Sequence, residues 1–337
     1  MDFSRDAGLF PFQIDLAGDR VLLVRMGEED YRGASFLDQR LLQQKQRPMQ
    51  WFDYAQLEQA ALPPADARFI FHIGHVGSTL IARLLGEAQG VLALREPLIL
   101  RQFAELRQLR ERPESPWDPA LYEPRLGKAL QWLSRGFPAA RTALVKATSF
   151  ANEIAGDVLE RGHKTLVLQL APERYFQTIL AGENSRQELA ALTPSRLTRL
   201  HARLGEEPFK LWTMSEGERV ALGWACEMVA LEEADDGSAM RLDFDAFLAE
   251  PAPQLMRVAS HLDIGLGDER AAELIASPIM SQYSKAPEHG YTPQLREEVL
   301  GEAARNHRQA IGDGMRWLDE AGKHFPLIAA ALERGAE

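Results

Sequence analysis

The chain of 337 residues contains a single cysteine, Cys226. One thiol cannot form an intrachain disulfide, and it supplies no cysteine spacing that is typical of a metal site. The flanking residues 224–228 are typical of a helix, so we expect a packed thiol rather than a nucleophile. The sequence therefore excludes an intrachain disulfide, and we expect no metal site.

Long apolar runs and an excess of basic charge are missing as well. No stretch reaches the ~18–20 apolar residues of a membrane-spanning helix, and residues 1–6 lack the basic region that begins a signal peptide. We therefore expect a cytoplasmic protein. The net charge of −11 argues against a non-specific nucleic-acid binder, but it leaves room for a local basic pocket.

The glycine-rich segment 69–85 lacks the lysine of an ATP- or GTP-binding loop. Residues 69–73 are typical of a buried strand, and apolar residues at helical spacing follow from residue 80. Gly74 and Gly77 let the backbone between them approach a ligand closely. Because free N–H groups at the start of a helix attract anions, the segment predicts an anion site. The alternative is a tight strand-to-helix turn without a ligand.

Short apolar strands alternate with helices from residue 69 onward. The expected strands are 69–73, 91–94, 142–146, 165–170 and 240–244, and long helical patterns occupy 173–204 and 216–234. This alternation predicts an α/β fold with a central, mainly parallel sheet of about five strands that is covered by helices on both faces.

The remaining segments have weaker patterns. In the small N-terminal appendage, residues 1–62, we expect strands at 10–15 and 20–25 and helices at 38–46 and 51–61. Residues 113–124 carry four prolines and are expected to form a loop. Residues 295–318 are charged and amphipathic, which most simply indicates solvated helices.

Ligands of parallel α/β sheets bind at the carboxyl ends of the strands. This rule places the segment 74–79, Glu96, Lys146 and Pro172 on one edge of the sheet. A glycine-rich turn, a carboxylate and an ammonium group on the same edge are a stronger indication of a site than any of them alone.

Three blocks of the chain resemble PAPS-dependent sulfotransferases. Residues 74–81, Gly-His-Val-Gly-Ser-Thr-Leu-Ile, look like the family's 5′-phosphosulfate loop. Residues 242–251 are similar to its strand, acidic turn and following proline. Residues 95–97, Arg-Glu-Pro, lie where tyrosylprotein-type and several bacterial members carry an acidic residue. The resemblance covers about residues 68–265 and is closest to a bacterial branch.

This resemblance implies an enzyme that moves a sulfonate group from PAPS (3′-phosphoadenylyl sulfate) to a hydroxyl or amine acceptor without a metal. It implies a P-loop NTPase-like three-layer sandwich over residues 63–337. Glu96 would be the general base, because Thr148 replaces the catalytic histidine of cytosolic-type members. Lys146 and His75 would stabilise the transferring group. The implied donor-binding residues of the loop are Gly74, His75, Val76, Gly77, Ser78, Thr79 and Leu80.

The departures from the family concern the donor's 3′-phosphate. Thr178 matches the position of the family's serine, but Leu170 occupies that of its arginine. Arg174 or Arg186 from the next helices could substitute for this arginine. Lys285 is the candidate in the region of the family's basic C-terminal loop.

Two other functions stay open at this point. A P-loop kinase or other nucleotide-dependent phosphotransferase is disfavoured by the missing lysine after Gly77. A non-catalytic module that binds a nucleotide is favoured by Leu170. The partner expected from the resemblance is a small-molecule or peptide acceptor.

Overall fold

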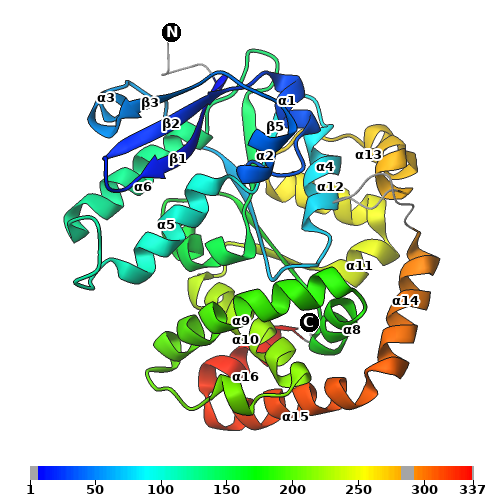
Figure 1. Ribbon diagram of the computed structural model, residues 1–337. Coiled ribbons are helices and arrows are strands. Elements are labelled where there is room, and N and C mark those ends of the chain that lie inside the picture. The colour runs from blue at the N-terminus through cyan, green and yellow to red at the C-terminus, as the bar shows by residue number, and fades with distance from the viewer. Residues whose placement is uncertain (1–6, 282–291, 336–337) are drawn as a thin grey trace.

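The computed structural model describes residues 7–281 and 292–335 (Figure 1). Its strands are β1 (Leu9–Asp15), β2 (Arg20–Arg25), β3 (Met49–Asp53), β4 (Arg68–His72), β5 (Val91–Arg95), β6 (Thr142–Lys146), β7 (Thr165–Gln169) and β8 (Met240–Asp243). Its α-helices up to residue 204 are α1 (Glu28–Gly33), α2 (Gln39–Gln44), α3 (Tyr54–Glu58), α4 (Ser78–Gly86), α5 (Leu98–Leu109), α6 (Pro119–Leu133), α7 (Ala155–Leu159), α8 (Pro172–Leu180) and α9 (Glu183–Leu204).

The later helices are α10 (Glu216–Ala234), α11 (Phe244–Ala249), α12 (Pro251–His261), α13 (Asp268–Ala276), α14 (Pro293–Asn306), α15 (Arg308–His324) and α16 (Pro326–Gly335). Short 3₁₀ helices are η1 (Ser149–Ile154), η2 (Leu211–Thr213) and η3 (Pro278–Ser281). In the part of the chain that the structure describes, no helix combines the length and the apolar character that crossing a membrane requires.

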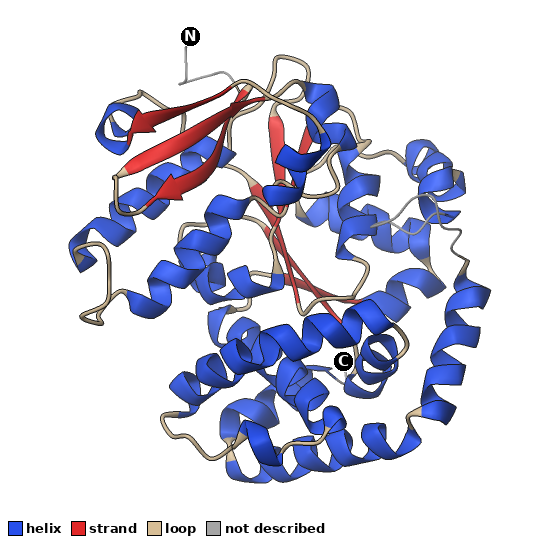
Figure 2. Ribbon diagram, in the orientation of Figure 1, coloured by secondary structure: helices blue, strands red, loops and turns tan. Residues whose placement is uncertain are grey.

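Five parallel strands form the central sheet in the order β5-β6-β4-β7-β8, which confirms the predicted α/β fold class (Figure 2). Parallel strands are joined by right-handed crossovers. From β4 the chain crosses to the edge strand β5, and it then returns through β6 and β7 to the opposite edge strand β8. The direction across the sheet thus reverses at β5, so α4 lies on one face and α5 to α10 lie on the other. Helix α12 returns to the face of α4 and contacts it.

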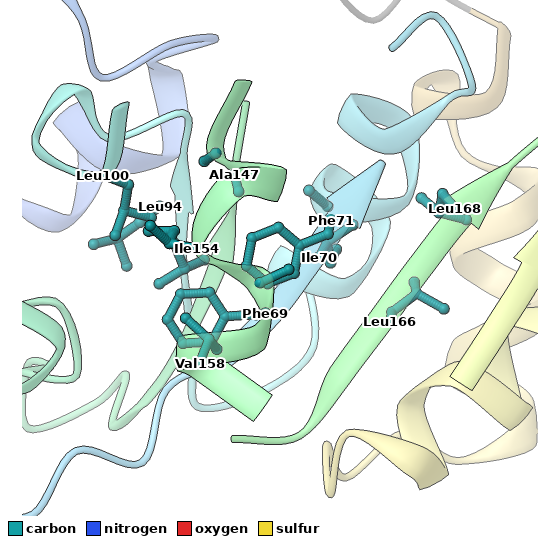
Figure 3. Close-up of a cluster of buried hydrophobic side chains, with 14 of the residues drawn as sticks. Phe69, Ile70, Phe71, Leu94, Leu100, Ala147, Ile154, Val158, Leu166 and Leu168 are labelled. Atoms are coloured by element: carbon teal, nitrogen blue, oxygen red, sulfur yellow. The ribbon is translucent and has the colours of Figure 1, made fainter. Parts of the chain in front are cut away.

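The central strands are buried because both of their faces are covered. Every residue of β7 is buried, and Phe69, Ile70 and Phe71 of β4 are fully buried. Figure 3 shows these side chains packed with residues from neighbouring strands and from the segments that follow β5 and β6. Continuous apolar runs of this kind are the sequence pattern of a doubly covered parallel sheet.

A second, antiparallel sheet of β1, β2 and β3 lies in the N-terminal appendage. The predicted helix over 51–61 is wrong at its start, because residues 49–53 pair with β2 and α3 only begins at Tyr54. The neighbouring strand overrides the local helical pattern. The appendage also contacts the central sheet: Leu37 N–H donates to the Arg95 carbonyl at 2.7 Å. A domain boundary at residue 62 stays a prediction.

Two further predictions need correction. The proline-containing segment 113–124 is not a loop throughout, because α6 begins at Pro119, where a missing N–H does no harm, and Asp118 caps it. The segment 295–318 is not simply solvated, because α15 packs on α10. A Cβ on Gly217 would lie 1.8 Å from the Ala310 carbonyl oxygen, so only glycine permits this close approach.

Candidate active site

The carboxyl ends of the central strands bring the predicted site residues to one edge of the sheet. Arg95 and Lys146 are paired in register at the ends of β5 and β6, and Glu96 N–H donates to the Lys146 carbonyl at 2.7 Å. The segment 74–79 continues from β4, which lies between β6 and β7. Pro172 opens α8 just after β7. The loop, Glu96 and Lys146 therefore share one rim.

The segment 74–79 has the backbone of an anion-binding turn. Gly74, His75 and Gly77 all have positive φ, at 87°, 57° and 66°. Gly77 is the N-cap of α4, and no side chain caps this helix. The Thr79 hydroxyl is buried and has no hydrogen-bond partner among the described residues. The first N–H groups of α4 and this hydroxyl are thus left to bind an anion.

Gly77 is required for a second reason, which is the position of Phe244. A Cβ on Gly77 would lie 1.9 Å from Cε2 of the Phe244 ring. Phe244 opens α11, and the Asp243 carboxylate caps that helix by accepting the N–H groups of Asp245 and Ala246 at 2.7 and 3.1 Å. The acidic turn after β8 therefore fixes a strand-to-helix turn, and it places an aromatic ring against the loop.

His72 shapes the start of the loop, a role that the sequence did not indicate. Its Nδ1 accepts the Gly74 N–H at 2.9 Å, and its Nε2 contacts the Ala147 carbonyl at 2.9 Å. A carbonyl only accepts, so Nε2 carries the proton and the ring is neutral. The Asn152 amide donates to the His72 carbonyl at 3.1 Å. The turn at Gly74 is thus held by a side chain from β4 and another from η1.

Glu96 and Lys146 form a buried ion pair. Lys146 is only 1% exposed, and its ammonium group contacts Glu96 Oε1. Glu96 also has φ of 55°, which is unusual for a residue with a side chain. Strained backbone of this kind is concentrated at functional sites. The carboxylate is therefore held in a fixed place beside the rim.

Arg40 reaches this carboxylate from the appendage. Its Nη2 lies 3.4 Å from Glu96 Oε2, and its guanidinium stacks over the Phe36 ring with 3.4 Å to the centroid. Asp38 accepts from Arg40 Nε at 2.9 Å. The sequence placed Arg40 in a polar helix, and nothing in its spacing relates it to a glutamate 56 positions later.

His75 is covered by the long helix α9. Its Nε2 lies 3.4 Å from Glu188 Oε2, and its Nδ1 lies 3.4 Å from the Ser185 hydroxyl. The imidazole is therefore within ion-pair distance of a carboxylate. Ser185 and Glu188 are further site residues that the sequence did not single out.

The candidates for a 3′-phosphate site are engaged with carboxylates. Arg174 donates to Asp245 at 2.6 Å. Burial lowers the pKa of Arg174, but the carboxylates of Glu297 and Asp245 outweigh it and raise the pKa. Arg186 donates to Glu216 at 2.7 Å, and this carboxylate raises its pKa. A phosphate at either arginine would have to replace these partners.

The other two candidates for the 3′-phosphate site are Thr178 and Lys285. The Thr178 hydroxyl donates to the Arg174 carbonyl at 2.8 Å, as a helical threonine commonly does. Lys285 lies outside the described residues. Leu170, at the family's arginine position, is fully buried, and its carbonyl accepts the Trp224 indole N–H at 3.0 Å. The assignment of a 3′-phosphate site stays a prediction.

Cys226 is buried in α10, and burial raises the pKa of its thiol to about 12. The thiol is therefore protonated near neutral pH, which agrees with a packed residue rather than a nucleophile. Within residues 7–281 and 292–335, no three His, Cys, Asp or Glu side chains are grouped so that they could hold a metal ion.

No family model and no curated protein matches this chain. Among solved structures, it is similar to a mouse sulfotransferase complexed with PAP, with 12% identity and a TM-score of 0.35 over 74% of this chain and 88% of that one. The sulfotransferase domain from the curacin biosynthetic pathway has 12% identity and a TM-score of 0.34 over 72% of this chain and 96% of its own. A sulfotransferase from Alicyclobacillus acidocaldarius has 14% identity and a TM-score of 0.34, over 75% and 98% of the two chains. At these TM-scores the residues of the site, rather than the likeness, carry the functional argument.

Proposed function

We propose that this protein is a PAPS-dependent sulfotransferase whose active site is the rim formed by the segment 74–79, Glu96 and Lys146. The observation that carries the proposal is the buried Lys146–Glu96 pair next to an uncapped helix N-terminus. This arrangement combines a proton acceptor, a fixed cation and an anion-binding turn. Transfer of a sulfonate to a hydroxyl or amine requires these three groups.

Glu96 accepts the proton of the acceptor as the acceptor's oxygen or nitrogen bonds to sulfur. The bond between sulfur and the bridging phosphate oxygen breaks, and adenosine 3′,5′-bisphosphate (PAP) leaves. Negative charge develops on the leaving oxygen, so a preorganised cation stabilises the transition state. Lys146 has three N–H donors and can share them between Glu96 and the transferring group.

The loop binds the phosphosulfate end of the donor. The N–H groups of Ser78, Thr79 and Leu80 begin α4, and the Thr79 hydroxyl adds a buried donor without a partner in the described chain. His75 stands where the sulfotransferase loop carries an arginine or lysine, and its ring is adjacent to Glu188. The site therefore favours a donor whose charge is held mainly by backbone groups and Lys146.

Ligand-dependent thermal stability tests this proposal directly. A ligand at 100 times its dissociation constant stabilises the folded state by about 2.7 kcal/mol. We expect PAP to raise the melting temperature more than ADP does, and magnesium–ATP to have little effect. A magnesium-dependent shift with ATP that exceeds the shift with PAP would contradict the sulfotransferase proposal and favour a phosphotransferase.

Two substitutions of His72 separate a role in ligand binding from a role in stability. In His72→Asn the amide oxygen stands near the position of Nδ1 and keeps an acceptor for Gly74 N–H. In His72→Gln the longer side chain keeps a donor for the Ala147 carbonyl. Each variant loses one hydrogen bond worth about 1 kcal/mol, so we expect similar melting temperatures. Only His72→Gln should weaken PAP binding, by about tenfold, in a titration calorimetry experiment. Equal PAP affinities would show that the Gly74 contact does not shape the binding loop.

A further inference from the structure

A small cavity on the face of the sheet that carries α4 is lined by several arginines. It lies where α1, α4 and β5 meet, and its lining includes Arg32, Arg83 and Arg95. Arg95 immediately precedes Glu96, and Arg83 is on the helix that follows the loop. This cavity is separate from the rim, because its residues belong to the side of the sheet on which α1 packs against β5.

Arg95 is a buried cation that forms no ion pair with a carboxylate of the described residues. It is 4% exposed, and its Nη2 donates to the carbonyls of Tyr31 and Arg32, both at 2.7 Å. Its Nε is buried and has no hydrogen-bond partner among the described residues. Two carbonyl dipoles satisfy one nitrogen, but they leave a full positive charge in the interior, which is costly unless it is paired.

Arg83 adds a second charge to the same cavity. Its Nη1 is also buried, and within residues 7–281 and 292–335 this side chain takes part in no hydrogen bond or ion pair. Burial and the charge of Arg83 lower the pKa of Arg95 to about 10, although the nearby Glu87 carboxylate acts in the opposite direction. Glu28 and Glu87 line the cavity, but neither carboxylate is within ion-pair distance of the two guanidinium groups in the described structure. Glu87 therefore offsets the repulsion between the two cations only in part, because it forms no ion pair with either of them in the described structure.

The cavity has room for one small particle. The centre of a water-sized sphere can occupy about 20 Å³ of it, and about 10–15 Å³ is enough for a single water molecule. This volume excludes a nucleotide. A monatomic anion is small enough, and in this cavity it would lie among lining residues that include Arg83 and Arg95, whose guanidinium groups are strong donors to anions.

We propose that Arg83 and Arg95 hold a buried chloride ion that links α4 to β5 and to the appendage. The ion would neutralise part of the repulsion between the two guanidinium groups and satisfy Arg83 Nη1 and Arg95 Nε. Because Arg95 also binds the carbonyls of Tyr31 and Arg32, the ion would indirectly fix α1. This proposal does not depend on the proposed sulfotransferase activity.

Thermal unfolding of the full chain at constant ionic strength tests it, with sodium chloride, sodium bromide or sodium gluconate as the only salt. The wild type should melt at least about 2 °C higher in chloride or bromide than in gluconate, since an ion that binds only the folded state stabilises it. Arg83→Gln removes one of the two repelling charges. We expect it to lose the chloride-dependent shift and to melt higher than the wild type in gluconate. Arg316→Gln, at an exposed position of α15, is the matched control and should keep the wild-type chloride shift.

Arg83→Gln is expected to lose the chloride-dependent shift and yet to melt higher than the wild type in gluconate. A purely structural role of Arg83 would not produce this combination. If the wild type melts at the same temperature in chloride and gluconate, or if Arg83→Gln keeps the full chloride shift, the proposal is wrong. Crystals grown in bromide give a direct view. An anomalous peak between the two guanidinium groups is expected, whereas a Glu28 or Glu87 carboxylate in that place would overturn the assignment.

Discussion

A Gly77→Ala variant should lose the PAP-dependent rise in melting temperature and about 3 kcal/mol of unfolding free energy. Two costs add at this residue. The added Cβ would lie 1.9 Å from the Phe244 ring, so the ring or the loop must move, and such overpacking typically costs about 1–3 kcal/mol. The φ of 66° at Gly77 also disfavours any residue with a Cβ, by about 1–2 kcal/mol. Either movement displaces the N–H groups that are proposed to bind the donor.

Gly90→Ala is the matched control for this experiment. Gly90 has φ of 81°, but a Cβ there would meet nothing within 4 Å. It should therefore pay only the backbone cost of about 1–2 kcal/mol and keep its response to PAP. Urea unfolding measures the loss of unfolding free energy, and the rise in melting temperature with PAP measures the response to the ligand. Equal losses of stability in the two variants, or a Gly77→Ala protein that still responds fully to PAP, would show that Phe244 does not constrain the loop.

A Lys146→Met variant should lose about 3–5 kcal/mol of unfolding free energy, because it leaves the Glu96 carboxylate without its main counter-charge. The Lys146 side chain is 1% exposed and that of Glu96 is 12% exposed, so water replaces the lost contact only in part. Arg40, at 3.4 Å and half exposed, compensates only in part. Methionine keeps the length and apolar character of the lysine stem, so the loss reports the charge rather than a cavity.

The double variant Lys146→Met/Glu96→Gln should regain most of this stability, since it removes the unpaired charge. Lys164→Met is the control, because it removes a lysine whose ion pair lies at the surface. Lys164 lies 2.9 Å from Asp263 with both side chains about half exposed, and such pairs are worth about 0–1 kcal/mol. Urea unfolding of the wild type, Lys146→Met, Glu96→Gln and the double variant gives the coupling energy between Lys146 and Glu96. If Lys146→Met were no more destabilising than Lys164→Met, the buried pair would not be the fixed element on which the proposed mechanism depends.

Segments whose conformation depends on near neighbours were predicted from the sequence. The run Phe69–Ile73, the glycines at 74 and 77 and the helix that follows are determined by local preferences, and the structure has them at the expected places. The alternation of strands and helices then predicted a parallel sheet. The carboxyl-end rule placed Glu96 and Lys146 on one rim because it follows from topology alone.

Segments whose conformation depends on a distant partner were not predicted. Residues 51–53 form a strand because β2 offers unpaired backbone groups to them. One face of helix α15 is buried because glycines at 217 and 314 let it approach α10. In each case, a contact across many residues outweighs the local pattern, and the sequence of the segment itself contains no sign of the partner.

The sequence alone determined the fold class, the glycine-rich turn before α4 and the two charged residues at the strand ends. Hydrophobic periodicity and glycine's freedom at positive φ act within a few residues, so a linear sequence displays them. Only the tertiary structure decided that His72 fixes Gly74, that Phe244 packs against Gly77, and that Arg40 reaches Glu96. It also decided that Arg83 and Arg95 share a cavity in which, among the described residues, no carboxylate forms an ion pair with either. These contacts join side chains from separate elements, and their distances are set only when the whole chain has packed.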